Sequence, residues 1–177
     1  MYENESGIDQ RQKYRIRTYN ANESVIRLEI KEKNRGLTKK TSCTLSRDEV
    51  ECIIHGTFPL RLDSREQMNR LRIKANTERF RPKVIIEYER TAFVCPEGTV
   101  RITFDRNIMA SRCCTAFFNE SVEGMIPVLP TGMHILEVKY DEFLPDYIAG
   151  TLEIGILQQS AFSKYYLGRL AINGFLL

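Results

Sequence analysis

Residues 13–19 read KYRIRTY and residues 25–33 read VIRLEIKEK, and these two stretches decide the fold. In both stretches, charged side chains alternate with mainly apolar ones at every second position, which is the period of a β-strand. Residues 20–23 (NANE) separate them and have the composition of a turn. The pattern predicts two strands that each have one apolar face and one charged face.

The remainder of the chain predicts more strands with helices grouped between them. Further strands are expected at 37–45, 84–94, 99–105 and 133–140. The capping boxes Ser46-Arg-Asp-Glu49 and Ser64-Arg-Glu-Gln67 predict two helices, the first ending at Gly56. Pro145 and Ser163 are expected to begin two more helices, which run through Leu152 and toward Leu170. This order is typical of the α+β class.

Length and composition limit the choice of protein class. The chain has 177 residues, of which 42% are hydrophobic and 28% charged, so we expect a single soluble domain over residues 1–177. No apolar run is long enough to span a membrane, and the opening MYENESGIDQ is too polar for a signal peptide. The chain has five cysteines, no C-x-x-C pair and two histidines, which disfavours zinc and favours a reduced, cytoplasmic setting.

The positive charge is concentrated near the start of the chain. The net charge is only +3, but residues 11–40 contain ten Lys or Arg against three Glu. A concentration of this kind points toward an anionic partner. The alternative is an ordinary solvated basic face, which composition alone would favour.

Long cations recur on one face of strand after strand, while the familiar nucleotide-loop and nucleophile motifs are missing from the sequence. Like charges on neighbouring strands repel each other, so a set of cationic strands suggests an anion between them. If the sheet closes into a barrel, these side chains point into one lumen, where Arg and Lys suit phosphate. Glu29 and Glu137 lie among the cations, and each either holds Mg²⁺ or Mn²⁺ or pairs with a neighbouring cation.

Five segments of the sequence resemble a known family in their order and spacing: KYRIRTYN, LEIKEKNRGLTKK, YERTAFVCPEGTVRITFD, ILEVKYDEFLP and FSKYYLGRL. They are similar to the polyphosphate-polymerase domain of the vacuolar transporter chaperone (VTC) family, one of the triphosphate tunnel metalloenzymes. The resemblance covers nearly all of the chain. It implies an antiparallel β-barrel with flanking helices around a triphosphate-binding tunnel.

The resemblance also implies roles for particular residues. Glu137 matches the family's metal-binding glutamate for Mn²⁺ or Mg²⁺, and Glu29 is a weaker second candidate. Lys40, or less surely Lys39, matches a tunnel lysine. The cations expected to support catalysis are Arg15, Arg17, Lys31, Arg90, Arg101, Lys139 and Lys164. The cations expected to contact phosphate are the same residues with Lys40 in place of Lys139.

The function implied is transfer of the γ-phosphate of ATP to a growing polyphosphate chain. Two departures from the family pattern favour a module that binds polyphosphate or nucleotide without turnover. Ala161 stands where polymerase-active members can carry a lysine. The family's opening strands have no counterpart in this sequence, so we expect an incomplete barrel. Triphosphate hydrolysis in the same tunnel is a further variant. We expect ATP and polyphosphate as partners, with a membrane-protein partner left open. Nucleic acid is not expected, because the aromatic residues alternate onto the apolar side.

Overall fold

The computed structural model describes residues 11–20, 22–58, 61–153, 155 and 160–175. The chain divides into two compact units, Met1–Lys83 with Cys113–Glu123 (the first unit) and Val84–Arg112 with Gly124–Leu177 (the second unit). The described residues form two antiparallel sheets and four α-helices, so the predicted α+β class is confirmed. No helix among them is both long enough and apolar enough to cross a membrane.

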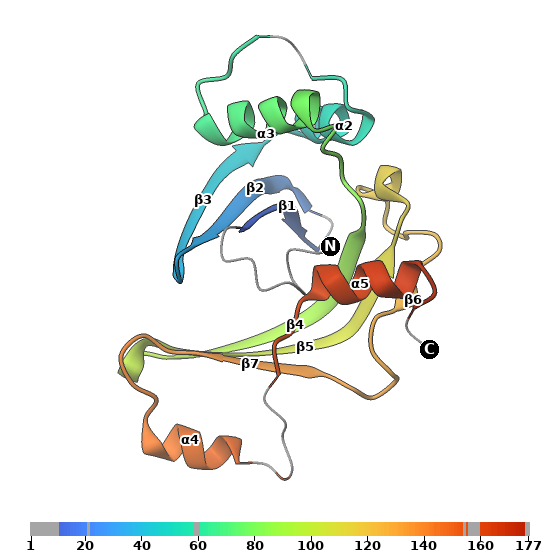
Figure 1. The fold of residues 1–177 in the computed structure, drawn as a ribbon. Coiled ribbons are helices and arrows are strands. Elements are labelled where there is room, and N and C mark those ends of the chain that lie inside the picture. The colour runs from blue at the N-terminus through green and yellow to red at the C-terminus, as the bar shows by residue number, and fades with distance from the viewer. Residues whose placement is uncertain (1–10, 21, 59–60, 154, 156–159, 176–177) are drawn as a thin grey trace. The chain divides into compact units, whose positions relative to one another are not determined.

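The first unit contains a three-stranded antiparallel sheet in the order β1-β2-β3, with two helices over one face (Figure 1). Ile26 and Leu28 of β2 are buried against Val50 of α2 and Leu71 of α3. The predicted alternation is therefore confirmed, because the apolar positions face the helices. The elements of this unit are β1 (Arg11–Tyr19), β2 (Asn22–Asn34), β3 (Leu37–Leu45), α2 (Arg47–His55), α3 (Glu66–Thr77) and the 3₁₀ turn η2 (Cys114–Ala116).

Helix α2 begins and ends where its sequence predicts. The Ser46 hydroxyl accepts a hydrogen bond from the Glu49 backbone N–H at 3.2 Å, and the Glu49 carboxylate accepts one from the Ser46 N–H at 2.8 Å. The two bonds satisfy donors that the first turn of a helix leaves free. At the other end, Gly56 has a φ of 75°, a left-handed conformation that glycine adopts without steric cost.

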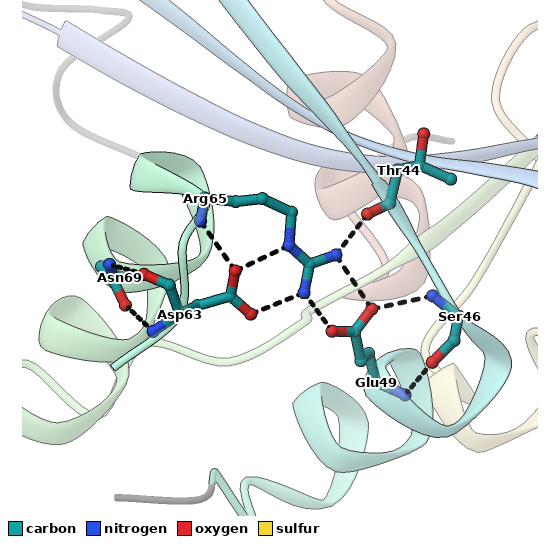
Figure 2. A network of polar contacts seen from close by, with 6 residues as sticks. All are labelled: Thr44, Ser46, Glu49, Asp63, Arg65 and Asn69. Atoms are coloured by element: carbon teal, nitrogen blue, oxygen red, sulfur yellow. Dashed lines mark hydrogen bonds and ion pairs between the residues drawn. The ribbon is translucent and has the colours of Figure 1, made fainter. Parts of the chain in front are cut away.

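The predicted capping box at Ser64 is wrong. Helix α3 begins at Glu66, with Arg65 at the N-cap position and no side-chain capping bond. The reason is an ionic network that organises this segment instead (Figure 2). The Arg65 guanidinium donates to Asp63 at 2.7 and 2.6 Å, and it also donates to the carboxylate of Glu49 and to the carbonyl oxygen of Thr44.

This network joins the start of α3 to α2 and to the end of β3. The hydrogen bonds from Arg65 hold the pKa values of the Asp63 and Glu49 carboxyls below their usual range. Asn69 of α3 completes the arrangement, because its side chain both donates to the Asp63 carbonyl oxygen and accepts from the Asp63 N–H. Both helices are thereby anchored to the edge of the sheet by charge as well as by apolar packing.

The second unit is built around β5, which pairs antiparallel with three other strands. Helix α5 packs on β4, β5 and β6 through the cluster that contains Ile108, Ala110 and Ile172 (Figure 1). Strand β5 runs well beyond the predicted end at residue 105. The elements are β4 (Ile85–Cys95), the 3₁₀ turn η1 (Glu97–Thr99), β5 (Val100–Ser111), β6 (Ile126–Pro127), β7 (Ile135–Lys139), α4 (Asp146–Leu152) and α5 (Lys164–Ile172).

A β-bulge in β5 decides which side chains share a face in this unit. Glu87 pairs with Met109 and Glu89 with Arg106, so β5 contributes one more residue than β4 over this stretch. Asn107 has a φ of 49°, a conformation that asparagine tolerates better than most residues. Such an extra residue shifts the alternation of side chains by one position. The apolar side chains that follow the bulge therefore lie on the same face as Asp105, which precedes it.

Candidate functional site

The charged face of the first unit is strongly cationic. The pairing of β1, β2 and β3 places the odd-numbered residues of β1 and β2 and the even-numbered residues of β3 on the side opposite the core. Over the regularly paired stretch Arg27–Lys33 of β2, the described residues of this face include one carboxylate, that of Glu29. Its cations are Arg11, Lys13, Arg15, Arg17, Arg27, Lys31, Lys33 and Lys40.

Glu29 pairs with neighbouring cations. Its carboxylate accepts from Arg15 Nε at 3.0 Å and lies 3.2 Å from Lys40 Nζ, while the residue is only 6% exposed. Burial alone would raise the pKa of Glu29, but the hydrogen bonds and charges of Arg15, Arg17 and Lys40 outweigh it and lower the pKa. These contacts support the pairing alternative for Glu29.

Of the two neighbouring lysines of β3, Lys40 lies on the charged face. Lys39 points to the opposite side, where it is paired in register with Glu32. Glu32 in turn accepts hydrogen bonds from Arg70 of α3 at 2.5 and 2.9 Å. Lys40 is therefore the better match for the expected tunnel lysine.

Several cations on this face lie directly opposite one another. The register pairs Lys13 with Lys31, Arg17 with Arg27, and Lys31 with Lys40. Like charges in directly opposed positions destabilise a sheet. Partial burial and the charges of Arg11 and Lys31 lower the pKa of Lys13, as expected for crowded cations.

In the second unit, the Asp105 carboxylate contacts two of the predicted cations, Arg90 and Lys164. It accepts from Arg90 Nε at 2.6 Å and from Arg90 Nη2 at 2.7 Å, and it lies 2.6 Å from Lys164 Nζ. Asp105 is fully buried, which by itself would raise the pKa of its carboxyl. The hydrogen bonds from Arg90 and Lys164 outweigh burial, so the pKa is lowered and that of Arg90 is raised.

Helix α5 and two aromatic rings position these cations. Ser163 caps α5, as predicted, by accepting from the Tyr166 N–H at 3.4 Å, and this fixes Lys164 at the first position of the helix. Lys164 Nζ lies 5.0 Å from the centre of the Tyr88 ring and 5.6 Å from the centre of the Phe162 ring. The guanidinium carbon of Arg90 lies 5.3 Å from the centre of the same Tyr88 ring. Cation–π attraction therefore adds to the ion pairs.

Glu137 lies one pair farther along the same face. It pairs in register with Thr103, and its carboxylate lies 3.0 Å from Lys139 Nζ and 3.8 Å from Arg90 Nη2. Burial would raise the pKa of Glu137, but Lys139, Arg90 and Lys164 together lower it, so the group is ionised at neutral pH. The next pair along the face sets Arg101 against Lys139, again two cations in direct opposition.

The structure thus brings the predicted residues together in two sets. Arg15, Glu29 and Lys40 contact one another in the first unit, on the face that also carries Arg17 and Lys31. Arg90, Glu137, Lys139 and Lys164 form a connected cluster in the second unit, next to Arg101. Convergence of the two sets on one tunnel remains a prediction.

Asp105 is the residue of this cluster that we did not predict. Its only signal in the sequence was its place in VRITFD, where it alternates with Arg101 and Thr103 onto one face. A carboxylate at such a position needs a cationic partner if it is buried. In the structure it holds Arg90 and Lys164 together.

The residues present fit a divalent cation that is shared with phosphate. The described residues contain no group of three His, Cys, Asp or Glu side chains able to hold a metal without other ligands. Mg²⁺ is usually held by one or two carboxylates together with substrate phosphates. Glu137 is the candidate for this arrangement, because its side chain is 40% exposed. Its carboxylate lies 3.0 Å from Lys139 Nζ, so a bound metal would have to share the carboxylate with this lysine or displace it.

Two antiparallel sheets, each with cations opposed across its strands, define an α+β protein suited to a multivalent anion. The family model for the VTC domain matches residues 1–173, and the chain belongs to this family. Membership implies a function related to polyphosphate. Neither the curated proteins nor the solved structures contain a match.

Proposed function

We propose that this protein is a metal-dependent polyphosphate polymerase that transfers the γ-phosphoryl group of ATP to a growing polyphosphate chain. The observation that carries the proposal is the cluster of Arg90, Lys164, Glu137 and Lys139 on one sheet face. It combines donors for phosphate oxygens with an ionised carboxylate. VTC-domain membership supports polyphosphate as the anion.

In this proposal, the chain's own residues bind and align the phosphates. Arg90 and Lys164 are held by Asp105, so they are oriented before substrate arrives and lose little freedom on binding. Arg101 and Lys139 oppose each other, and a phosphate between them would relieve their repulsion. Glu137 would hold Mn²⁺ or Mg²⁺ against the phosphates, where the ion neutralises charge on their oxygens.

The transfer needs no covalent enzyme intermediate. A terminal oxygen of the polyphosphate attacks the γ-phosphorus of ATP, and the bond from that phosphorus to the β–γ bridging oxygen breaks. ADP leaves with the bridging oxygen, and the polymer gains one phosphate. Alignment of the reactants and stabilisation of charge on the phosphate oxygens supply most of the rate acceleration, as is usual in enzymatic phosphoryl transfer.

Glu137→Gln tests the proposal, because it keeps the side chain's shape and removes the charge that would hold the metal. We expect Mn²⁺-dependent polymer formation from ATP to be lost. Calorimetry should show that affinity for tripolyphosphate in the absence of metal is retained or increased. Glu142→Gln, which removes an exposed carboxylate from the same unit, is the control. Equal polymer synthesis by the Glu137→Gln protein would contradict the proposal.

A second candidate is a module that binds polyphosphate or nucleotide without turnover. Ala161, which is exposed just before α5, favours it, because the family resemblance implies a lysine at this position in polymerase-active members. Tight tripolyphosphate binding together with no polymer and no phosphate release would support this candidate. Release of inorganic phosphate from triphosphate without polymer would instead indicate hydrolysis.

A further inference from the structure

Thr103 of β5 carries a buried hydroxyl within the candidate site of the second unit. The residue is only 3% exposed, and its Oγ1 forms no hydrogen bond with the residues that the structure describes. A hydroxyl that is removed from water without a hydrogen bond destabilises the folded protein, and native proteins contain few such atoms. A partner that becomes available in another state of the site would explain this hydroxyl.

The register of the sheet limits which residue can be that partner. Across the sheet, Thr103 is paired with Ala92 of β4, which has no polar side-chain atom, and with Glu137 of β7. Along β5, its neighbours on the same face are Arg101 and Asp105. The hydrogen of a hydroxyl needs an acceptor, and a guanidinium offers none. The two carboxylates are therefore the candidate acceptors.

These two carboxylates differ in how far their oxygens are already occupied. Asp105 accepts two hydrogen bonds from Arg90 and lies 2.6 Å from Lys164 Nζ. Glu137 has one close cation, because its Oε1 lies 3.0 Å from Lys139 Nζ. Its Oε2 lies 3.8 Å from Arg90 Nη2, which is beyond hydrogen-bond distance. Glu137 can therefore accept a further hydrogen bond more readily than Asp105 can.

The side chains of Thr103 and Glu137 start from directly opposed positions on two strands. The Cβ atoms of such a pair are about 4.5–5.5 Å apart, so a rotation of the glutamate side chain can bring an oxygen to the hydroxyl. In the structure, Glu137 instead contacts Lys139. With a divalent cation on the carboxylate, the ammonium group would be repelled and Glu137 would be free to turn. Carboxylates that hold a metal are usually oriented by a hydrogen bond from a further residue.

We propose that Thr103 is a positioning residue, whose hydroxyl donates a hydrogen bond to the Glu137 carboxylate when that carboxylate holds a divalent cation. The inference rests on the proposed function, because it takes Glu137 as the metal-binding residue. Thr103 acts through Glu137 and does not contact phosphate itself, since its Oγ1 is covered. Loss of the hydroxyl should therefore weaken only the binding that depends on metal.

Thr103→Val tests the proposal, because valine has nearly the same shape and no hydroxyl. Calorimetry with tripolyphosphate and Mn²⁺ should show about a tenfold loss of affinity, the lower end of the usual effect for a residue that orients a metal ligand. With EDTA in place of Mn²⁺, affinity for tripolyphosphate should stay within about twofold, because no phosphate contact is removed. Thr103→Ser keeps the hydroxyl and should retain the wild-type response to Mn²⁺.

Thermal melts in EDTA separate a positioning role from a structural one. Because the hydroxyl has no partner among the described residues, replacing it with valine should leave the melting temperature equal or higher. Loss of a hydroxyl that stabilised the fold would lower the melting temperature instead. Thr91→Val is the matched control, since Thr91 is exposed and is paired with Phe104 on the opposite face of the same sheet. This control should retain the wild-type affinity for tripolyphosphate with and without Mn²⁺.

A double-mutant cycle shows whether Thr103 acts through Glu137. In the Glu137→Gln protein the carboxylate that would hold the metal is already lost. Adding Thr103→Val should therefore cause no further loss of affinity for tripolyphosphate in the presence of Mn²⁺. A second loss of about tenfold in that background would contradict the proposal, because Thr103 would then act on another residue.

The outcomes separate this inference from the proposed function. If Mn²⁺ strengthens tripolyphosphate binding equally in the wild type and in Thr103→Val, the positioning role is refuted and the proposed function stands. If Thr103→Val loses affinity equally with and without Mn²⁺, or melts below the wild type, the positioning role is also refuted. If Mn²⁺ does not strengthen binding by the wild type, the metal-dependent function and the inference both fail.

Discussion

The Asp105→Asn substitution would separate the structural support of the candidate site from its phosphate contacts. Asp105 is fully buried and contacts Arg90 and Lys164, whose side chains are 24% and 22% exposed. Asparagine has nearly the same shape but no charge. The substitution would leave two cations close together without the carboxylate that compensates them.

The expected cost is about 3 kcal/mol of unfolding free energy. Removing one partner of a buried ion pair typically costs about 3–5 kcal/mol, because the remaining charge is left uncompensated. We take the lower end, since Arg90 and Lys164 retain some access to water and the asparagine oxygen can still accept a hydrogen bond. Adding Lys164→Met should cost less than the sum of the two single changes, because the remaining repulsion disappears.

Urea unfolding followed by circular dichroism measures this cost, since the chain has no tryptophan for fluorescence. Asp141→Asn is the control, because Asp141 is an exposed carboxylate of the same unit, and its change should stay within about 0.5 kcal/mol. If Asp105→Asn is as stable as the control, Asp105 does not hold these cations together.

The same carboxylate predicts a dependence of stability on pH. The pKa of Asp105 is lowered in the folded protein, so its contribution is fully present above the unfolded value of about 3.9. That contribution is lost as the pH falls through the folded pKa. The difference in unfolding free energy between wild type and Asp105→Asn should therefore be constant near neutral pH and shrink in strong acid. A difference that stays constant down to the folded pKa would contradict the assignment.

Two further predictions concern how the helices are attached. Ser46→Ala should destabilise the protein by about 1 kcal/mol through loss of the α2 cap, whereas Ser64→Ala, where no cap forms, should have little effect on the urea midpoint. Gly168→Ala in α5 places a Cβ 2.3 Å from Ile86 Cδ1 and should cost about 1–3 kcal/mol in the same assay. Gly150→Ala in α4 meets nothing within 4 Å and should be neutral or stabilising.

The parts of the fold that could be predicted from the sequence are those with a local signal. The charged alternation of residues 13–19 and 25–33 predicts both strands and the face on which Arg15, Glu29 and Lys31 lie. The capping box and Gly56 predict α2 nearly to the residue. In each case the interaction that decides the structure joins residues close together in the chain.

The parts that could not be predicted depend on contacts between distant residues. Asp105 meets Lys164 only because α5 packs back onto β5. The start of α3 follows a network in which Arg65 reaches Glu49 and Thr44, so the local capping signal at Ser64 is overridden. Strand β5 continues past residue 105 because a bulge lets its apolar residues face α5, and a strict period of two does not reveal that continuation.

The bulge at Asn107 decides which residues of β5 share a face, and the candidate site depends on that choice. Before it, Arg101, Thr103 and Asp105 share a face, and after it Ile108 and Ala110 join that same face under α5. Deleting this one residue would restore uninterrupted alternation and leave both segments on that face, whereas inserting one residue beside it would turn Ile108 and Ala110 to the opposite side. After such an insertion, helix α5 would lose the apolar residues on which it packs, and Lys164 would no longer reach Asp105, although every residue of the candidate site would still be present.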